Sequence, residues 1–215
     1  MENLDQKPFD WKLLFFVLAI STAVMSLGYN DYQIYTGAVA AHPYTWLVWT
    51  LTQGTAANVA RKHYGGLLAK GLAIAAGMIF LTFLFSVWYC IYYGLDIVDL
   101  NLYDGVILVV ALIAFAISFK WKHGTFYAAL AVSVIDLVGY IPTYEKVWKN
   151  PNSENSWVWA IITLSWIFAI FSAEKFNKEN ITYPITMALA SAAMVVEILY
   201  LPQIKMLVDY VVSAM

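Results

Sequence analysis

Seven long apolar stretches alternate with short polar segments along this chain. The stretches cover residues 13–35, 44–60, 67–93, 104–120, 125–147, 156–173 and 181–201. A helix needs roughly 20 mostly apolar residues to cross the hydrocarbon core of a bilayer. Trp, Tyr and Phe crowd the ends of the stretches, as in the aromatic belts of membrane proteins. The pattern predicts an all-α, polytopic membrane protein with about seven transmembrane helices.

The composition agrees with a single transmembrane domain over residues 1–215. Hydrophobic residues make up 62% of the chain and charged residues 12%, and soluble domains carry about twice that charged share. A net charge of -2 without a basic run argues against nucleic-acid binding. The only cysteine, Cys90, cannot form an internal disulfide. No A-x-A cleavage site closes the first apolar stretch, so we expect an uncleaved first span.

The distribution of Lys and Arg predicts the orientation. With seven spans, the amino terminus and the second, fourth and sixth loops share one side of the membrane. Nine basic residues belong to that side, and three belong to the other side: Lys146, Lys149 and Lys205. Because Lys and Arg are in excess in cytoplasmic loops, we expect a plasma-membrane protein with a cytoplasmic amino terminus. The tail, residues 202–215, is either an interfacial helix or an extension of the last span.

An internal repeat appears when the chain is aligned with itself so that Gly28-Tyr29 falls on Gly139-Tyr140. The same alignment, without a gap, matches Trp46 with Trp157, Thr52 with Thr163 and Tyr89 with Tyr200. Identity is low, but each match falls at the same depth of the corresponding span. We therefore expect two parallel three-helix repeats, 13–93 and 125–201, joined by a linker helix at 104–120. In one class of small transporters with this arrangement, the substrate site lies at the repeat interface near the bilayer midplane.

With this arrangement and two short segments, the chain resembles the SWEET and PQ-loop superfamily of small seven-helix membrane proteins. The segments are Gly139-Tyr140-Ile141-Pro142-Thr143 and His42-Pro43-Tyr44-Thr45-Trp46. The region from Asp136 to Pro151 is also similar to a group of bacterial membrane proteins. The resemblance implies a transporter in the bacterial inner membrane, with aromatic residues in its site.

The first repeat departs from the pattern of this superfamily, in which a proline bends the first helix of each repeat. Pro142 supplies that proline in the second repeat, whereas Asp31 stands at the equivalent position of the first. The Pro-Gln pair typical of the superfamily is also missing there. A common hinge in both halves is therefore not expected. Pro142 removes one backbone hydrogen bond, and together with Gly139 it is either a gating hinge or a fixed kink.

Asp136 carries the strongest chemical signal because it lies midway along an apolar span. Placing a carboxylate there costs roughly 2.5–3.5 kcal/mol, and such residues usually face a bundle interior or water. One interpretation is a carboxylate that binds substrate or exchanges a proton. The other is a structural carboxyl that ties helices together by hydrogen bonds.

Polar and aromatic side chains on the second and sixth spans complete the predicted substrate site. The polar candidates are Gln53, Asn58, Thr52 and Thr163. Their alternative role is interhelical hydrogen bonding, worth roughly 0.6–2 kcal/mol per contact in membranes. Trp49 and Trp166 are candidates for stacking against a substrate ring. For Trp46, Trp49, Trp157 and Trp159 together, anchoring at the membrane interface is the first expectation.

The sequence carries no set of residues that predicts an enzyme, a cofactor or a metal site. His42, His63 and His123 all lie in predicted loops, and no pair has the i, i+4 spacing of a helical zinc site. Two functions from different classes stay open. The first is a small secondary transporter or facilitator for a compact polar solute, working by alternating access between the repeats. The second is a non-transporting membrane sensor or scaffold that binds a protein partner. The sequence leaves both a monomer and a homo-oligomer open.

Overall fold

Helices account for all the regular secondary structure that the computed structural model describes, over residues 9–39, 43–63, 66–95, 102–120 and 126–213. Their bounds, in chain order, are α1 Trp11–Tyr35, α2 Pro43–His63, α3 Gly66–Tyr93, α4 Leu102–Lys120, α5 Phe126–Lys149, the short 3-10 helix η1 Pro151–Ser153, α6 Ser156–Ser172 and α7 Lys178–Ser213. The first six predicted apolar stretches each coincide with one α-helix to within a few residues, whereas α7 continues 12 residues beyond the stretch 181–201. The all-α prediction is confirmed.

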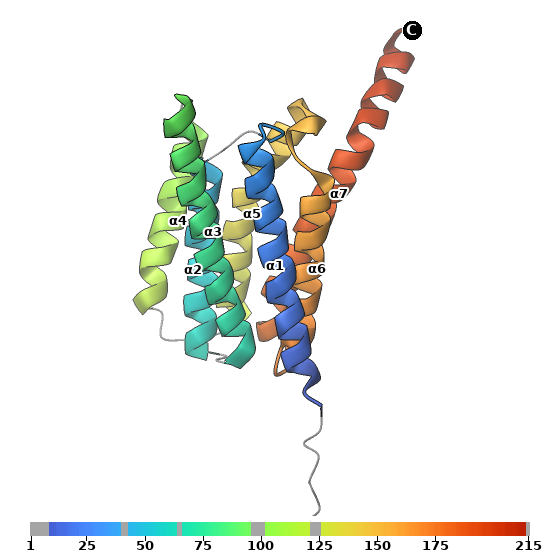
Figure 1. Cartoon of the computed structure of the whole chain (residues 1–215). Coiled ribbons are helices and arrows are strands. Elements are labelled where there is room, and N and C mark those ends of the chain that lie inside the picture. Colours follow the sequence, from blue (N-terminus) through green and yellow to red (C-terminus); the bar gives the residue numbers. More distant parts are fainter. Residues whose placement is uncertain (1–8, 40–42, 64–65, 96–101, 121–125, 214–215) are drawn as a thin grey trace, which may run out of the picture.

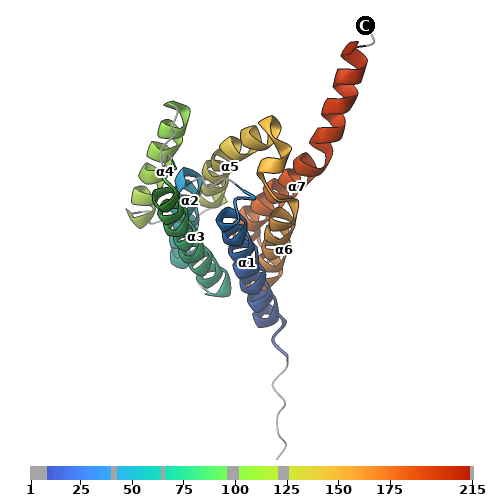
Figure 2. The same cartoon turned by 45° about the horizontal axis from the view of Figure 1, so that its top comes forward.

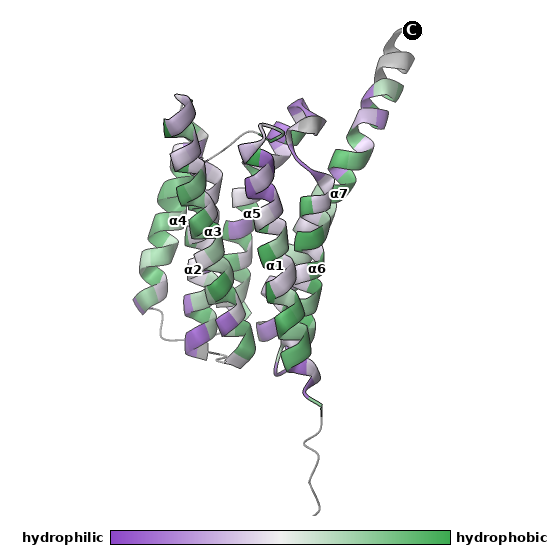
Figure 3. Ribbon diagram, in the orientation of Figure 1, coloured by the Kyte–Doolittle hydropathy of each residue, from purple (hydrophilic) through white to green (hydrophobic). Residues whose placement is uncertain are grey.

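Among the residues that the structure describes, three helices are long and apolar enough to cross a membrane: Trp11–Tyr35, Gly66–Tyr93 and the Asn180–Leu207 part of α7. The helix Ser156–Ser172 is shorter but also apolar. Apolar residues cover much of the helices, and strongly hydrophilic residues lie mainly toward the helix ends (Figure 3). These features indicate a membrane-embedded helical protein.

The last helix includes residues 202–213 of the tail. α7 continues as one helix from Lys178 to Ser213, through Pro184 and Pro202. At about 1.5 Å per residue it is roughly 54 Å long, well beyond the thickness of a bilayer core. Its final turns extend past the end of the bundle (Figure 1). Segment 202–213 is therefore an extension of the last helix.

Successive helices run in opposite directions and pack in a regular order (Figures 1 and 2). In the first three helices, α3 contacts both α1 and α2, and in the last three, α7 contacts both α5 and α6. The two groups meet where α1 packs on α6 and where α2 packs on α5. α4 lies at one edge and contacts α2 and α5.

Polar caps fix two of the helix starts. Asp10 accepts hydrogen bonds from the backbone N–H groups of Lys12 and Leu13 at the start of α1. Asn155 accepts from the N–H of Trp157 at 2.9 Å at the start of α6. Such side chains satisfy N–H groups that have no partner within the helix. The amide of Asn155 also donates to Gln33 Oε1 at 3.0 Å, which ties α6 to the end of α1.

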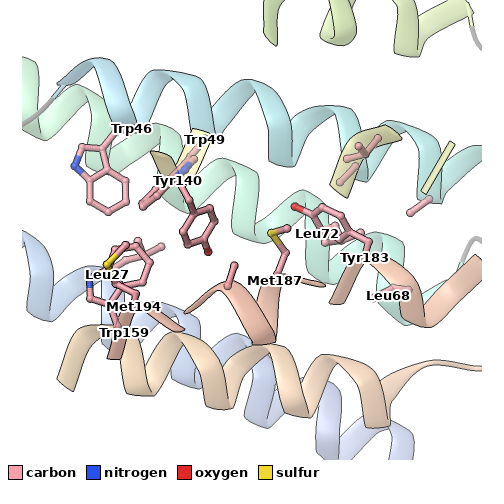
Figure 4. Close-up of a cluster of buried hydrophobic side chains, with 14 of the residues drawn as sticks. Leu27, Trp46, Trp49, Leu68, Leu72, Tyr140, Trp159, Tyr183, Met187 and Met194 are labelled. Carbon is pink, nitrogen blue, oxygen red and sulfur yellow. The ribbon is translucent and has the colours of Figure 1, made fainter. Parts of the chain in front are cut away.

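The core is rich in aromatic and sulfur-containing side chains (Figure 4). Trp46 and Trp49 from α2, Tyr140 from α5 and Trp159 from α6 are all buried in one cluster. The prediction that Trp46, Trp49 and Trp159 anchor the protein at the membrane interface is wrong, because an anchor must face the headgroups. Trp157 alone of the four is exposed, at 70%.

The predicted residue-by-residue register of the repeat is wrong in the first two helices. Gly28 and Tyr29 are exposed, whereas their predicted counterparts Gly139 and Tyr140 are buried. Trp46 is 8% exposed, in contrast to the exposed Trp157. Equivalent positions should have similar burial, so these pairs are not structurally equivalent. Shifting the alignment of the two repeats by one position would account for the difference in burial, because neighbouring residues of a helix point about 100° apart.

Candidate functional site

The carboxylate of Asp136 lies at the meeting point of three helices, and the residue is 1% exposed. Thr52 on α2 donates a hydrogen bond to Oδ1. Tyr183 on α7 donates to Oδ2 at 2.8 Å, and Gln53 Nε2 on α2 donates to the same oxygen at 3.3 Å. All three donors are neutral, and they satisfy an otherwise costly buried carboxylate.

Helical spacing explains why these groups meet. On α5, Val132, Asp136, Tyr140 and Thr143 are buried and recur at intervals of three or four residues, so they share one face of the helix. That face is directed toward α2 and α7. Gly139 allows the close approach of α2, because a Cβ there would lie 3.3 Å from Val48 Cγ1 and 3.4 Å from Trp49 Nε1.

The Thr52 hydroxyl can serve both protonation states of the carboxyl group. Besides contacting Asp136, Oγ1 lies 3.2 Å from the backbone oxygen of Trp49. A hydroxyl has one proton to donate and can also accept. When Asp136 is ionised, Thr52 donates to it. When Oδ1 carries a proton, it donates to Thr52, and the Thr52 proton then goes to the Trp49 carbonyl. The carboxyl group of Asp136 therefore keeps a hydrogen bond to Thr52 in either protonation state.

A cavity of about 90 Å³ adjoins Asp136 and Gln53. Its walls come from both groups of helices: α1, α2 and α3 on one side, α5 and α6 on the other. Phe16 near the start of α1, Leu67 at the start of α3 and Ser172 at the end of α6 belong to its lining. The cavity thus extends from Asp136 toward the end of the bundle at which α1 begins (Figure 1).

An aromatic layer borders the cavity on the opposite side. The Trp49 ring centroid is 5.1 Å from that of Trp46, 5.2 Å from that of Tyr140 and 5.5 Å from that of Trp159. Figure 4 shows Trp46, Trp49 and Tyr140 gathered at one end of the core and Tyr183 nearer the other. Rings from α2, α5 and α6 therefore pack against one another on the side of the cavity that faces the end of the bundle at which α2 begins.

Two buried polar atoms of the cavity lining have no hydrogen-bond partner within the part of the chain that the structure describes. They are Gln53 Oε1 and Trp49 Nε1. Both side chains are more than nine-tenths buried. A buried polar group without a partner costs about 1–3 kcal/mol, which is unusual in a purely structural core. Such an acceptor and donor beside a cavity are typical of a binding site.

The structure brings together most of the predicted site residues. Asp136, Thr52 and Gln53 form the hydrogen-bonded centre described above. Trp49 and Trp166 line the cavity, and Trp166 also packs edge-to-face on Tyr183 with centroids 5.6 Å apart.

Two predicted site residues, Asn58 and Thr163, lie outside the centre. Asn58 donates to Ser118 on α4 at 3.2 Å. It follows Gln53 by five positions and so points about 140° away from it around α2. Thr163 donates to the Trp159 carbonyl of its own helix at 2.8 Å, a local bond that Thr commonly makes within helices. Neither residue lines the cavity.

Sequence reasoning missed Tyr183 as a partner of Asp136. In the sequence, Tyr183 is a phenol within an apolar span, one residue before Pro184. It did not stand out as a site residue because tyrosines are common at span ends. Tyr140 and Trp159 were noted in a motif and as an anchor, not as parts of a site. Only the packing of α5, α6 and α7 shows that these rings face inward.

The fold and site define a membrane-embedded helical bundle with a buried acidic centre beside a small internal cavity. No group of three or more His, Cys, Asp or Glu that could hold a metal ion lies within the described residues. No protein-family model, curated protein or solved structure significantly matches the chain.

Proposed function

We propose that this protein is a small secondary transporter or facilitator for a compact polar metabolite. It works by alternating access between the α1–α3 and α5–α7 groups. The observation that carries the proposal is a cavity shared by both groups, with Asp136 and Gln53 in its wall. A structural carboxyl alone would require neither a cavity nor an unpaired amide oxygen beside it.

Seven membrane spans are part of this proposal. The alternating directions of the helices support it (Figure 1), and so does the excess of Lys and Arg in the segments at the end where α1 begins. That end is then cytoplasmic. The cavity accordingly extends toward the cytoplasm, and the aromatic layer closes the opposite side.

Helix contacts support two repeats related by an axis along the membrane normal. Replacing α1, α2 and α3 by α5, α6 and α7 leaves the main contacts within and between the groups unchanged. In the first two helices, burial agrees best with a register that relates Ser26 to Asp136 and Trp49 to Trp159. In the third helix, burial agrees better with a register that relates Leu72 to Pro184 and Thr82 to Met194. This pattern favours the proposed likeness to SWEET and PQ-loop proteins.

Alternating access requires the aromatic layer to open while the cytoplasmic side closes. Trp49 contacts α5 at Gly139, three residues before Pro142. Pro142 cannot donate a backbone hydrogen bond, so α5 bends there at lower cost than elsewhere. We assign Gly139 and Pro142 to the hinge of the second group.

A ligand screen tests the proposal. Purified protein in detergent is heated with sugars, amino acids, nucleosides, vitamins and small amines, at pH 5.5 and 7.5. We expect at least one compound to stabilise the wild type and Thr163→Val, but not Asp136→Asn. Thr163→Val is the matched control because Thr163 lies outside the cavity.

If no compound stabilises the wild type and Asp136→Asn is equally stable, the site assignment fails. The alternative, a sensor or scaffold that binds a protein partner, then becomes the better account.

A further inference from the structure

The charged side chain in the cavity lining is acidic. Asp136 belongs to that lining, and no Lys, Arg or His does among the described residues. The hydrogen-bond partners of the carboxylate are Thr52, Gln53 and Tyr183, all of them neutral. An ionised carboxylate at this depth is stabilised most by a cation brought next to it.

The cavity lining also offers several hydrogen-bond acceptors. The hydroxyls of Ser26, Ser165 and Ser172 donate to backbone carbonyls at 2.9, 2.9 and 2.8 Å. With their protons so placed, the oxygens of these serines can accept hydrogen bonds from a ligand. Gln53 Oε1 is a further acceptor without a partner. These acceptors, together with the carboxylate of Asp136, suit a ligand that carries N–H donors.

Aromatic faces supply the rest of the wall. Trp46, Trp49, Trp159 and Trp166 line the cavity together with leucine, isoleucine and alanine side chains. Tryptophan is the strongest aromatic partner for cations, worth about 2 kcal/mol or more when the pair is desolvated. The same surfaces bury an apolar carbon skeleton well.

We infer that the substrate is a small organic ammonium ion. Its N–H groups bond to Gln53 Oε1 and pair with Asp136, and its apolar part packs against the tryptophan rings. The inference rests on the proposed transport function and specifies its substrate class. Size limits the class further, because an engineered cavity of about 150 Å³ holds benzene, and this cavity has about 90 Å³. Only a few non-hydrogen atoms fit without some opening of the cavity.

Three probes of nearly equal shape test the charge preference: isobutylamine, isobutanol and isobutyrate. Binding is measured at pH 7.5 by tryptophan fluorescence and by thermal stabilisation of the full chain. We expect the amine to bind at least tenfold more tightly than the alcohol in the wild type and in Thr163→Val. Isobutyrate should bind most weakly, because its charge repels Asp136.

Two variants test the assigned groups. Asp136→Asn should reduce the preference for amine over alcohol to less than threefold, and Gln53→Leu should weaken amine binding at least fivefold. If Asp136→Asn does not fold, two results still test the inference: the order of affinities of the three probes for the wild type, and the effect of Gln53→Leu on amine binding. Equal binding of amine and alcohol, or no amine binding, overturns the inference. A neutral or acidic compound that stabilises the protein in the wider screen would also overturn the inference of an ammonium substrate. It would leave the transport proposal intact.

Discussion

At the residue scale, the hydrogen bonds of Asp136 connect α5 to α2 and α7. Thr52 and Tyr183 donate to different oxygens of the carboxylate, so each bond contributes separately. Replacing one donor leaves a buried charged acceptor short of a partner, which costs more than losing a local bond within one helix. The contribution of each donor can therefore be measured with conservative substitutions.

Thr52→Val and Thr163→Val form a matched pair. Both remove a hydroxyl and keep the shape of the side chain. Thr52→Val should lower the free energy of unfolding by about 1–3 kcal/mol, because Asp136 loses a buried donor. Thr163→Val should change it by less than about 0.5 kcal/mol, since only a bond to its own helix is lost. Unfolding by SDS in mixed micelles measures the free energy of unfolding of both variants. Equal decreases in the two variants would contradict the assigned role of Thr52.

Tyr183→Phe tests the partner that sequence reasoning missed. It removes only the phenol oxygen that donates to Asp136 at 2.8 Å. We expect a loss of about 1–3 kcal/mol in the same unfolding measurement. Tyr200→Phe is the control, because Tyr200 is exposed, and it should have almost no effect. A Tyr183→Phe protein as stable as the control would exclude a strong bond to Asp136.

Sequence reasoning identified Asp136, Thr52 and Gln53 correctly as neighbours, since a carboxylate in a span must face polar groups. It failed for Asn58 and Thr163 because it used only their depth along the helix. Depth alone does not determine which way a side chain points around the helix axis. The partners on α7, in turn, depend on packing between segments far apart in the chain.

At the scale of helices, the close contact of α2 and α5 depends on Gly139. Gly139→Leu should destabilise the protein by about 1–3 kcal/mol, because its side chain must displace Val48 or Trp49. Gly28→Leu is the control, since nothing lies within 4 Å of a Cβ at Gly28. It should be neutral or stabilise α1 by roughly 0.5–1 kcal/mol.

The same pair tests the register of the repeat. If Gly28 and Gly139 were equivalent, as the self-alignment of the sequence suggests, both substitutions would destabilise to a similar degree. Different effects favour the register that burial supports in the first two helices, in which Ser26 corresponds to Asp136. Hydropathy predicted the boundaries of α1 to α6 well, because apolar length determines them, but it did not predict the end of α7 at Ser213. It could not fix the register to a single position, because apolar residues occupy both faces of these helices.

At the scale of the whole molecule, the seven spans that we propose would place the two termini on opposite sides of the membrane. Fusions of a fluorescent protein and of alkaline phosphatase to each terminus distinguish the sides. We expect the amino-terminal end to be cytoplasmic and the end of α7 to lie outside, as the Lys and Arg distribution indicates. Termini on the same side would contradict seven spans.

Alternating access is the central claim, and the sole cysteine makes it testable. Cys90 is buried, so Cys90→Ala provides a background for Ala75→Cys in the cavity wall. Leu81→Cys is the control because Leu81 is exposed on the outside of α3. The measurement is the rate of modification by a membrane-impermeant thiol reagent, added from either side of oriented vesicles.

Ala75→Cys should react readily from the cytoplasmic side. From the other side it should react about 10- to 1,000-fold more slowly, as expected for a minor conformation populated at roughly 0.1–10%. Leu81→Cys should react from neither side. If Ala75→Cys reacts from the outer side no faster than Leu81→Cys, the cavity never opens there, and the protein is not an alternating-access transporter.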